Sequence, residues 1–280
     1  MHLFVASVVC VLLALSFPGI ISRLEDKFTN CSEFFSKGEP PVISGILENS
    51  EPQNNDYRVV CQKYKNKTRY ATLYDTKKKI PVFSAYKYTG TNELTRPEIP
   101  WMIELQLEPS GAQMCAPFAK QARNRDYRVI NTVYRPSALF PMNHTAEKDT
   151  AESTFTLTNS VPQNTRFKEG IWTLVENAIR ENMDNYCLDN NNKTVAYVLT
   201  GAIPGDKNLR TVNIPSHMWT AFCCYSSATT SWVSQTYWTE NISNNDVTNI
   251  TLGSLEDLQI FLNETLGRKV ELFNNNCVEM

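Results

Sequence analysis

The chain has 280 residues, with 27 Lys and Arg against 29 Asp and Glu and a formal net charge of −2 at pH 7. Nucleic-acid binding depends largely on neutralising phosphates, so this balance gives no overall charge in its favour. The length fits one large domain or two small ones, and the sequence has no Gly/Ser-rich or Pro-rich linker, internal repeat, phosphate-binding loop or dinucleotide fingerprint.

The first residues predict the compartment. Residues 3–17 are almost all apolar, and Pro18, Gly19 and Ser22 follow. This pattern is typical of a secretory signal peptide at residues 1–22, and its removal would leave 23–280 as a single domain. An N-terminal membrane anchor is the alternative, but the apolar run is shorter than the roughly twenty residues that a spanning helix needs. No later segment is apolar enough to cross, so we expect no membrane partner.

Seven Asn-x-Ser/Thr sequons are spread along the chain. They begin at Asn30, Asn66, Asn143, Asn192, Asn241, Asn249 and Asn263. Sequons that carry sugar lie on the surface, so we expect these segments to be exposed. Together with the signal peptide they predict a secreted, extracellular glycoprotein.

Seven cysteines follow the signal peptide: Cys31, Cys61, Cys115, Cys187, Cys223, Cys224 and Cys277. Most should pair in an oxidising compartment, and the odd number leaves one free or intermolecular. We predict a bridge between Cys31 and Cys61 and another from Cys277 to Cys223 or Cys224, although spacing alone does not determine connectivity. No Cys-x-x-Cys pair indicates a zinc site.

The first half of the mature chain is predicted to be β-structure. Residues 57–64 and 68–74 alternate apolar and polar side chains, as paired strands do, and residues 80–88 continue the sheet. The same region is rich in basic residues, which fit either the solvated rim of a hairpin or a phosphate-binding track. These residues are Arg58, Lys63, Lys65, Lys67, Arg69, Lys77, Lys78 and Lys79.

The second half mixes strands and helices. Residues 196–201 and 219–225 read as strands, with a loop at 201–205 after the first. Helical periodicity over 169–186 groups Ile171, Leu174, Val175, Ala178 and Ile179 on one face. A second helix over 254–266 opens with Ser254 and Asp257 as a capping box, stops at Gly267, and turns Leu255, Leu258, Phe261 and Leu262 inward. Because strands and helices do not alternate regularly, an α+β fold is predicted.

Three central segments carry the chemistry. They read Tyr-Arg-Pro-Ser-Ala-Leu-Phe-Pro at 134–141, Thr-Leu-Thr-Asn-Ser-Val-Pro-Gln at 156–163 and Phe-Lys-Glu-Gly-Ile-Trp-Thr-Leu-Val-Glu at 167–176. Their order and spacing resemble the DNA/RNA non-specific endonuclease family, where the segments read Asp-Arg-Gly-His-Leu-x-Pro, Leu-Thr-Asn-x-x-Pro-Gln and Asn-x-Gly-x-Trp-x-x-apolar-Glu. Segments at 31–35, 70–75, 80–86, 212–219 and 223–224 are similar to the secreted vertebrate branch called endonuclease domain-containing 1 proteins. The resemblance implies an antiparallel β-sheet core with flanking helices and a ββα-metal (His-Me finger) nuclease motif.

The resemblance also implies which residues stand at the catalytic positions. The family His is the general base that deprotonates the attacking water, and Ala138 takes its place. Arg135, Pro136 and Ser137 then stand at the preceding Asp, Arg and Gly. Two other histidines remain in the mature chain. We expect His144 to lie in a surface loop and His217 to be structural.

The metal position differs as well. The family Asn that holds Mg²⁺ is replaced by Lys168, whose ammonium repels the ion and has no lone pair. Asn159 and Glu176 still match the family Asn and Glu. Arg96 is a loose candidate for a phosphate-facing Arg, because its spacing from the motif departs from the family pattern.

These substitutions predict a catalytically impaired pseudonuclease that still binds nucleic acid or other polyanions. Lys168, Arg135 and Arg96 are the candidate phosphate-binding residues, unless these side chains simply face solvent in a decayed site. No metal or other cofactor is expected. Two alternatives stay open. One is an active Mg²⁺-dependent endonuclease with a rearranged base, and the other is a scaffold that binds a secreted protein partner.

Overall fold

The computed structural model describes residues 23–92, 94–109, 118–130, 132–242, 250–275 and 277–279. Among these residues the core is a nine-stranded sheet in the order β1-β5-β6-β7-β10-β11-β12-β13, with β15 also pairing with β12. Neighbouring strands are antiparallel except for β12 and β15. The predicted α+β fold with an antiparallel core is confirmed.

The strands of the large sheet are β1 (Arg23–Glu25), β5 (Tyr57–Tyr64), β6 (Lys67–Asp75), β7 (Ile80–Tyr88), β10 (Ala196–Leu209), β11 (Val212–Ser226), β12 (Ser231–Glu240), β13 (Thr251–Gly253) and β15 (Val278–Glu279). The small sheets contain β2 (Val42–Ile43), β3 (Leu47–Glu48), β4 (Glu51–Pro52) and β14 (Val270–Glu271), and separately β8 (Tyr134–Ala138) and β9 (Ser160–Asn164). The α-helices are α2 (Lys148–Ser153), α3 (Thr165–Phe167), α4 (Thr173–Tyr186) and α5 (Leu255–Leu266), with a π-helical turn, η7 (Lys168–Trp172), between α3 and α4. Short 3-10 turns are η1 (Phe28–Phe34), η2 (Ser36–Gly38), η3 (Leu105–Leu107), η4 (Asn124–Tyr127), η5 (Met142–His144), η6 (Leu157–Asn159) and η9 (Phe273–Asn275). In the described part of the chain no helix is long and apolar enough to span a membrane.

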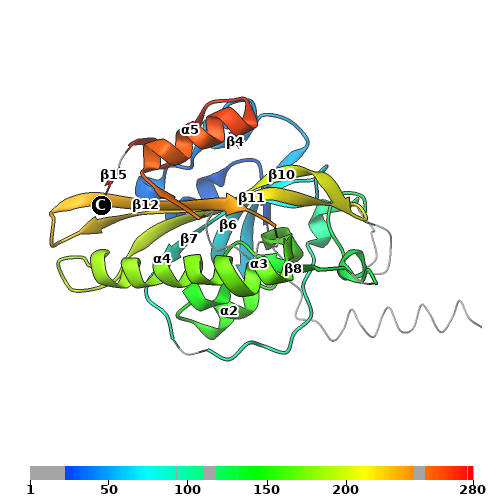
Figure 1. The fold of residues 1–280 in the computed structure, drawn as a ribbon, viewed down its shortest axis with the longest axis horizontal. Helices are drawn as coiled ribbons and strands as arrows, with labels where there is room; N and C mark the ends of the chain where they lie inside the picture. Colours follow the sequence, from blue (N-terminus) through cyan, green and yellow to red (C-terminus); the bar gives the residue numbers. More distant parts are fainter. Residues whose placement is uncertain are drawn as a thin grey trace, which may run out of the picture.

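The large sheet separates two apolar cores. Figure 1 shows it across the middle of the molecule, with α5 on one side and α2, α3, α4 and β8 on the other. Successive residues of a strand point to opposite faces. On β11, Trp219, Ala221 and Cys223 accordingly belong to the core beneath α5, whereas Phe222 and Cys224 belong to the core beneath α4.

Helix α5 forms as its end signals predict. The Ser254 side chain accepts a hydrogen bond from the Asp257 backbone, and the Asp257 carboxylate accepts one from the Ser254 backbone. The helix ends at Gly267, whose φ of 63° lies in the left-handed region that glycine adopts without strain. Leu255, Leu258 and Leu262 are buried against the sheet, so the predicted helix, its cap and its inner face are confirmed.

Strand β10 runs through the segment that was predicted to be a loop. Residues 201–204 stay paired with β11, the register shifts on both sides of Pro204, and the pairing resumes at Lys207. Pro204 has no backbone N–H to give to a ladder, so an irregularity there is expected, but it does not end the strand. Position 201 requires glycine because the Trp219 ring packs directly on its backbone, and a Cβ built there would lie 2.2 Å from that ring.

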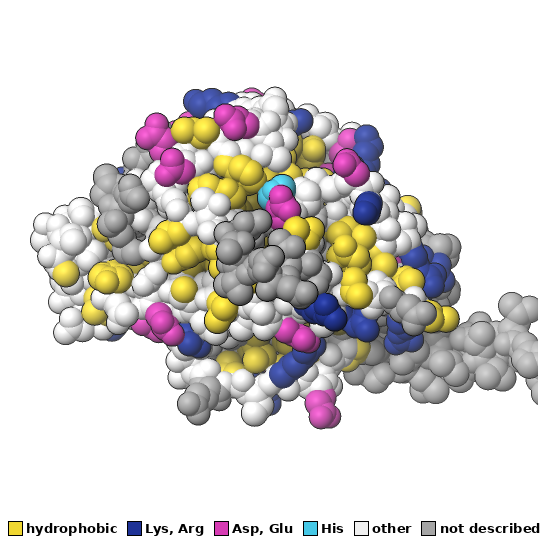
Figure 2. Space-filling view, viewed as in Figure 1, with side chains coloured by type: hydrophobic (Ala, Val, Ile, Leu, Met, Phe, Trp, Pro, Cys, Tyr) yellow, Lys and Arg dark blue, Asp and Glu magenta, His cyan; other side chains and the backbone are white. Residues whose placement is uncertain are grey.

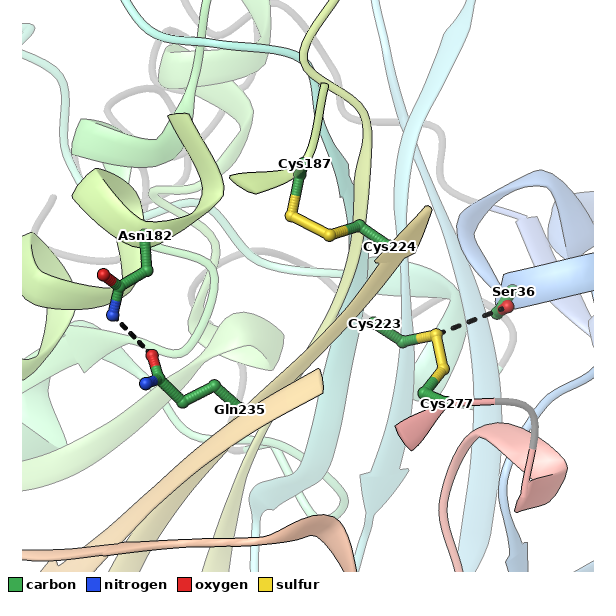
Figure 3. Close-up of a disulfide and its surroundings, with 7 residues drawn as sticks. All are labelled: Ser36, Asn182, Cys187, Cys223, Cys224, Gln235 and Cys277. Atoms are coloured by element: carbon green, nitrogen blue, oxygen red, sulfur yellow. Dashed lines mark hydrogen bonds between the residues drawn. A yellow bond between two sulfur atoms is a disulfide. The ribbon is translucent and has the colours of Figure 1, made fainter. Parts of the chain in front are cut away.

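Strand alternation also explains the disulfides. The neighbours Cys223 and Cys224 point to opposite faces of β11, and Figure 3 shows them pairing with Cys277 and Cys187 respectively. Cys31 pairs with Cys61. The predicted Cys31–Cys61 bridge and a bridge from Cys277 are therefore confirmed, with Cys223 as the partner. No cysteine in the described residues is free, and Cys115 lies outside them.

The basic hairpin of β5 and β6 is held to α2 by ion pairs. Lys65 pairs with Asp149 at 2.7 Å, and Arg69 pairs with Glu147 at 2.6 Å. Lys67 also lies 3.3 Å from Glu147. Because acidic residues in and beside α2 take up the charges of Lys65, Lys67 and Arg69, the structure favours the hairpin rim over a phosphate track for these three residues.

The buried face of the long helix is rotated from the prediction. Trp172, Val175, Ile179 and Met183 are buried, but Leu174 is 58% exposed. Val175 and Ile179 are buried as predicted, but the face that packs on the sheet continues to Met183 and turns Leu174 toward solvent.

The sequons do not all lie on the surface. Asn30, Asn66 and Asn192 are exposed, and Asn143 and Asn263 are half-buried. Asn241 is only 2% exposed. Its Nδ2 donates to the carbonyls of Pro162 and Pro215, both at 3.0 Å, and its Oδ1 accepts from the Asn164 backbone. The expectation that Asn241 is at the surface is therefore wrong, since this side chain joins β9 to β11. Asn249 lies outside the described residues.

Candidate active site

A hairpin and the helix that follows it form a ββα unit on the α4 side of the sheet. In the hairpin, β8 and β9 are antiparallel, with Arg135 opposite Gln163 and Ala138 opposite Ser160. The chain then turns directly into α3, where the Asn164 side chain caps the helix by accepting hydrogen bonds from two backbone N–H groups. All three motif segments of the sequence thus meet in one unit.

A cleft of about 640 Å³ opens beside this unit. Three basic side chains line it against two acidic ones, and the rest of the wall comes from β8, β9, η5, α3, α4 and two segments in contact with each other, which contain Trp101 and Phe155. The charged residues are Arg96, Arg135, Lys168, Glu169 and Glu176. The structure therefore brings the three predicted phosphate-binding residues together. Figure 2 shows Lys and Arg side chains gathered on the side of the molecule where Figure 1 labels α3 and β8.

Lys168 and Glu176 form an ion pair inside the cleft. The Lys168 ammonium donates directly to the Glu176 carboxylate, and the two side chains are 28% and 7% exposed. In a regular α-helix, residues eight apart would point about 80° away from each other around the axis. The π-helical turn at 168–172 reduces this offset, because its hydrogen bonds span five residues. Thr173 fixes the turn by donating a 2.5 Å hydrogen bond to the Lys168 carbonyl.

Ala138, which the motif resemblance places at the family's general-base position, offers only a methyl group. Ala138 ends β8 and lines the cleft. Asn159 lies below it, fully buried and not among the residues that line the cleft. Its Oδ1 accepts from Ser84 at 2.8 Å and from the Phe140 backbone at 3.0 Å, and its Nδ2 donates to Thr154 at 2.9 Å. Asn159 therefore holds the end of β8 in place and presents no free group to the cleft.

Neither remaining histidine presents a free nitrogen to the cleft. His144 is 2% exposed, so the expectation of a surface loop is wrong. Its Nδ1 bonds to the Tyr86 hydroxyl and its Nε2 to the Glu176 carbonyl, both at 2.8 Å. Burial lowers the pKa of His144 to about 4, with the nearby Lys168 and Arg180 charges acting in the same direction. His217 packs against Phe261 of α5, on the other side of the sheet.

Two arginines lie along the rim of the cleft. Arg135 is exposed and donates to the carbonyls of Thr132 and Tyr134, at 2.9 and 3.0 Å. Arg96 places its guanidinium 5.4 Å from the centre of the Phe155 ring, which also contacts Trp101. Neither guanidinium has a carboxylate partner within ion-pair distance among the described residues, so both charges remain available to an anion.

Two buried polar side chains in the cleft wall have no partner in the described part of the chain. Gln163 is 1% exposed, and neither its side-chain oxygen nor its nitrogen is hydrogen-bonded; the Ser137 hydroxyl is in the same state. A buried polar group without a partner is costly and calls for a ligand or water. Sequence reasoning gave Gln163 no role, although it ends a motif and lies opposite Arg135 in the hairpin. It also gave no role to Glu169, and it placed Asn143 on the surface rather than at the cleft.

The donor set of this cleft does not fit the family's metal. Mg²⁺ takes oxygen ligands in near-octahedral geometry. Here the Lys168 ammonium is bonded to Glu176, and the motif resemblance matches these two residues to the family's metal-binding Asn and its supporting Glu. Among the described residues, no three His, Cys, Asp or Glu side chains cluster in a way that could hold an ion.

Known proteins resemble this chain in sequence and in fold. The family model for DNA/RNA non-specific endonuclease matches residues 116–265, more than half of the 280 residues. Endonuclease domain-containing 1 protein of Homo sapiens is 26% identical over 280 residues and that of Mus musculus 28% over 268, covering 93% and 90% of this chain. The chain spans about half the length of these relatives, 50% and 48%.

A solved structure shares the fold. This chain matches a chain in the crystal structure of the EndoG/EndoGI complex, a structure that describes the mechanism of EndoG inhibition. The TM-score is 0.57 and the sequence identity 18%, over 77% of this chain and 89% of that one. The ββα unit, the three motif segments and the matching family model agree: this chain belongs to the DNA/RNA non-specific endonuclease family.

Proposed function

We propose that this protein is a secreted pseudonuclease, whose cleft binds nucleic acid or another polyanion without hydrolysing it. The ion pair between Lys168 and Glu176 carries the proposal. It puts a fixed positive charge next to the residue that would otherwise support a metal and its water. An ammonium there activates no nucleophile, and because Glu176 balances its charge, the attraction of a phosphate comes mainly from the guanidinium groups of Arg96 and Arg135, which are unpaired in the described part of the chain.

Loss of hydrolysis is expected because neither Ala138 nor His144 can deprotonate a water molecule in the cleft. Deprotonation of water needs a base at hydrogen-bonding distance from it, and losing such a base costs about 10²–10⁴ in rate. Ala138 offers no lone pair. His144 has both ring nitrogens engaged and lies beneath the cleft surface.

Retained anion binding is supported by the charges and hydrogen-bond donors of the wall. The guanidinium groups of Arg96 and Arg135 are unpaired with carboxylates among the described residues. An ammonium has three donors, so Lys168 keeps others after bonding to Glu176. The unpartnered Gln163 and Ser137 add neutral donors that a bound phosphate, sugar or base edge would satisfy.

The extracellular setting belongs to the same proposal. We take residues 1–22 as a signal peptide and 23–280 as one mature domain, which one sheet running from β1 to β15 supports. Three disulfides among the described residues fit an oxidising compartment, where such bonds persist.

The test is binding and cleavage measured together on the secreted protein. Plasmid DNA and RNA are incubated with Mg²⁺ or Mn²⁺ and analysed on gels, while filter binding across a salt series reports affinity. We expect salt-dependent binding and intact substrate. Arg135→Ala should weaken binding, whereas Lys77→Ala, in the turn between β6 and β7 and paired with Asp56, should not. Absence of binding at low salt would overturn the proposal.

An active endonuclease with a different base is the second candidate, and one observation favours it. Glu169 is exposed, lines the cleft and, unlike Glu176, has no lysine bonded to it among the described residues. If the wild type cleaves DNA in a metal-dependent way and Glu169→Gln abolishes the cleavage, this candidate replaces the pseudonuclease.

A further inference from the structure

One sequon lies at the cleft itself. Asn143 belongs to η5, and its side chain lines the cleft next to Pro141 and Met142. Its Nδ2 lies 3.4 Å from Oδ1 of Asn177 on α4. The attachment atom for a sugar is therefore held between η5 and α4, two of the segments that form the cleft wall.

The segment that carries this sequon is firmly fixed. His144 is anchored by Tyr86 and by the Glu176 carbonyl. The Thr145 hydroxyl donates to the Met142 carbonyl at 2.7 Å. A group attached to Asn143 would consequently stay at the rim and would not swing away with a mobile loop.

The amide of Asn143 can carry a sugar without breaking the fold, whereas that of Asn241 cannot. A glycosylated asparagine keeps one N–H on Nδ2. Asn143 uses only one N–H, in the long contact to Asn177, and is half-buried. Asn241 donates both to carbonyls and is 2% exposed, so a sugar there would break the junction of β9 and β11.

We infer that an N-linked glycan on Asn143 covers the mouth of the cleft. N-glycans are bulky and polar, and one rooted at this rim hinders long polymers more than small anions. The covered cleft would then favour short ligands, chain ends or loops over the side of a duplex. This inference goes beyond polyanion binding and depends only on the proposed secretory route.

The glycosylation of Asn143 and the shielding of the cleft by the glycan are both measured without any ligand. The full chain is produced in a secretory eukaryotic host, and glycopeptide mass spectrometry gives the occupancy of each sequon. Hydroxyl-radical footprinting then measures oxidation of Trp101, which lines the cleft but belongs to a different wall segment. The wild type is compared with Asn143→Gln and with Asn192→Gln, which removes an exposed sequon in the loop after α4. Thr145→Ser keeps both the sequon and the hydroxyl and serves as the local control.

We expect Asn143 to be occupied, and Asn143→Gln to raise Trp101 oxidation several-fold while Asn192→Gln and Thr145→Ser leave it near the wild-type rate. Enzymatic removal of glycans from the folded wild type should give the same rise, which keeps the test valid if Asn143→Gln folds poorly. Unchanged Trp101 oxidation after glycan removal overturns the inference. So does an empty Asn143 when Asn66 and Asn192 are occupied. If every sequon is empty, the secretory route fails along with the inference, whereas failure of polyanion binding leaves the footprint unaffected.

Discussion

Replacing Lys168 by methionine removes the cation from the central ion pair but keeps an unbranched apolar stem. Glu176, whose side chain is 7% exposed, is then left as a buried carboxylate without its partner. Breaking a buried pair from one side costs about 3–5 kcal/mol. Because the Lys168 side chain is 28% exposed and partly screened by water, we expect a smaller loss of unfolding free energy, about 2–3 kcal/mol.

A second substitution separates the energy of the ion pair from the other effects of removing the lysine side chain. Replacing both residues, Lys168→Met with Glu176→Leu, removes the uncompensated charge and should restore most of the stability, because buried ion pairs are often no better than apolar pairs. The double-mutant cycle from urea unfolding, followed by Trp fluorescence, gives the coupling energy.

An exposed lysine provides the matched control. Lys148 is 79% exposed and 3.9 Å from Glu152, so Lys148→Met should change stability by less than about 1 kcal/mol. If Lys168→Met stays within about 0.5 kcal/mol of the wild type, the pair contributes nothing measurable. The account of an ammonium fixed in the cleft would then be refuted.

Four other predictions follow from the structure. The pKa of His144 is about 4 when folded, below its ordinary 6.5, so the unfolded chain binds more protons between these values. The free energy of unfolding should therefore be highest above pH 6.5 and fall by about 2–4 kcal/mol as the pH is lowered toward 4. Urea unfolding of His144→Gln should show a weaker dependence of this free energy on pH. Replacing Cys187 and Cys224 together by Ala should cost about 2–5 kcal/mol, measured by denaturant unfolding without reductant. Arg69 is buried and paired with acids next to α2, so Arg69→Met should lower the melting temperature and reduce its salt dependence in calorimetry. Arg135→Ala should reduce the slope of log affinity for DNA against log salt by about 1, with no change in the melting temperature.

The sequence predicts the fold well where local rules decide it. Alternation predicted the hairpin strands, and cap residues predicted both ends of α5. It predicted the long helix and the burial of Val175 and Ile179, but it placed Leu174 on the buried face, and which edge of the apolar stripe packs on the sheet is decided by tertiary contacts.

For the candidate site, the motif predicted which residues meet but not what each one contacts. Asn159 and His144 both proved to be buried and fully hydrogen-bonded, since their partners come from strands and turns distant in sequence. The same holds for Asn241, whose carbonyl partners lie on β9 and β11. Long-range hydrogen bonds of this kind cannot be derived from a local pattern.

The central claim is that chemistry was lost at named positions while the fold was kept. The most direct measurement is Mg²⁺-dependent plasmid cleavage by the wild type beside one variant that restores the family motif. That variant carries Arg135→Asp, Pro136→Arg, Ser137→Gly, Ala138→His and Lys168→Asn. We predict an inactive wild type and an active variant, whose activity Glu176→Ala removes. Cleavage by the wild type that Glu176→Ala abolishes would contradict the account.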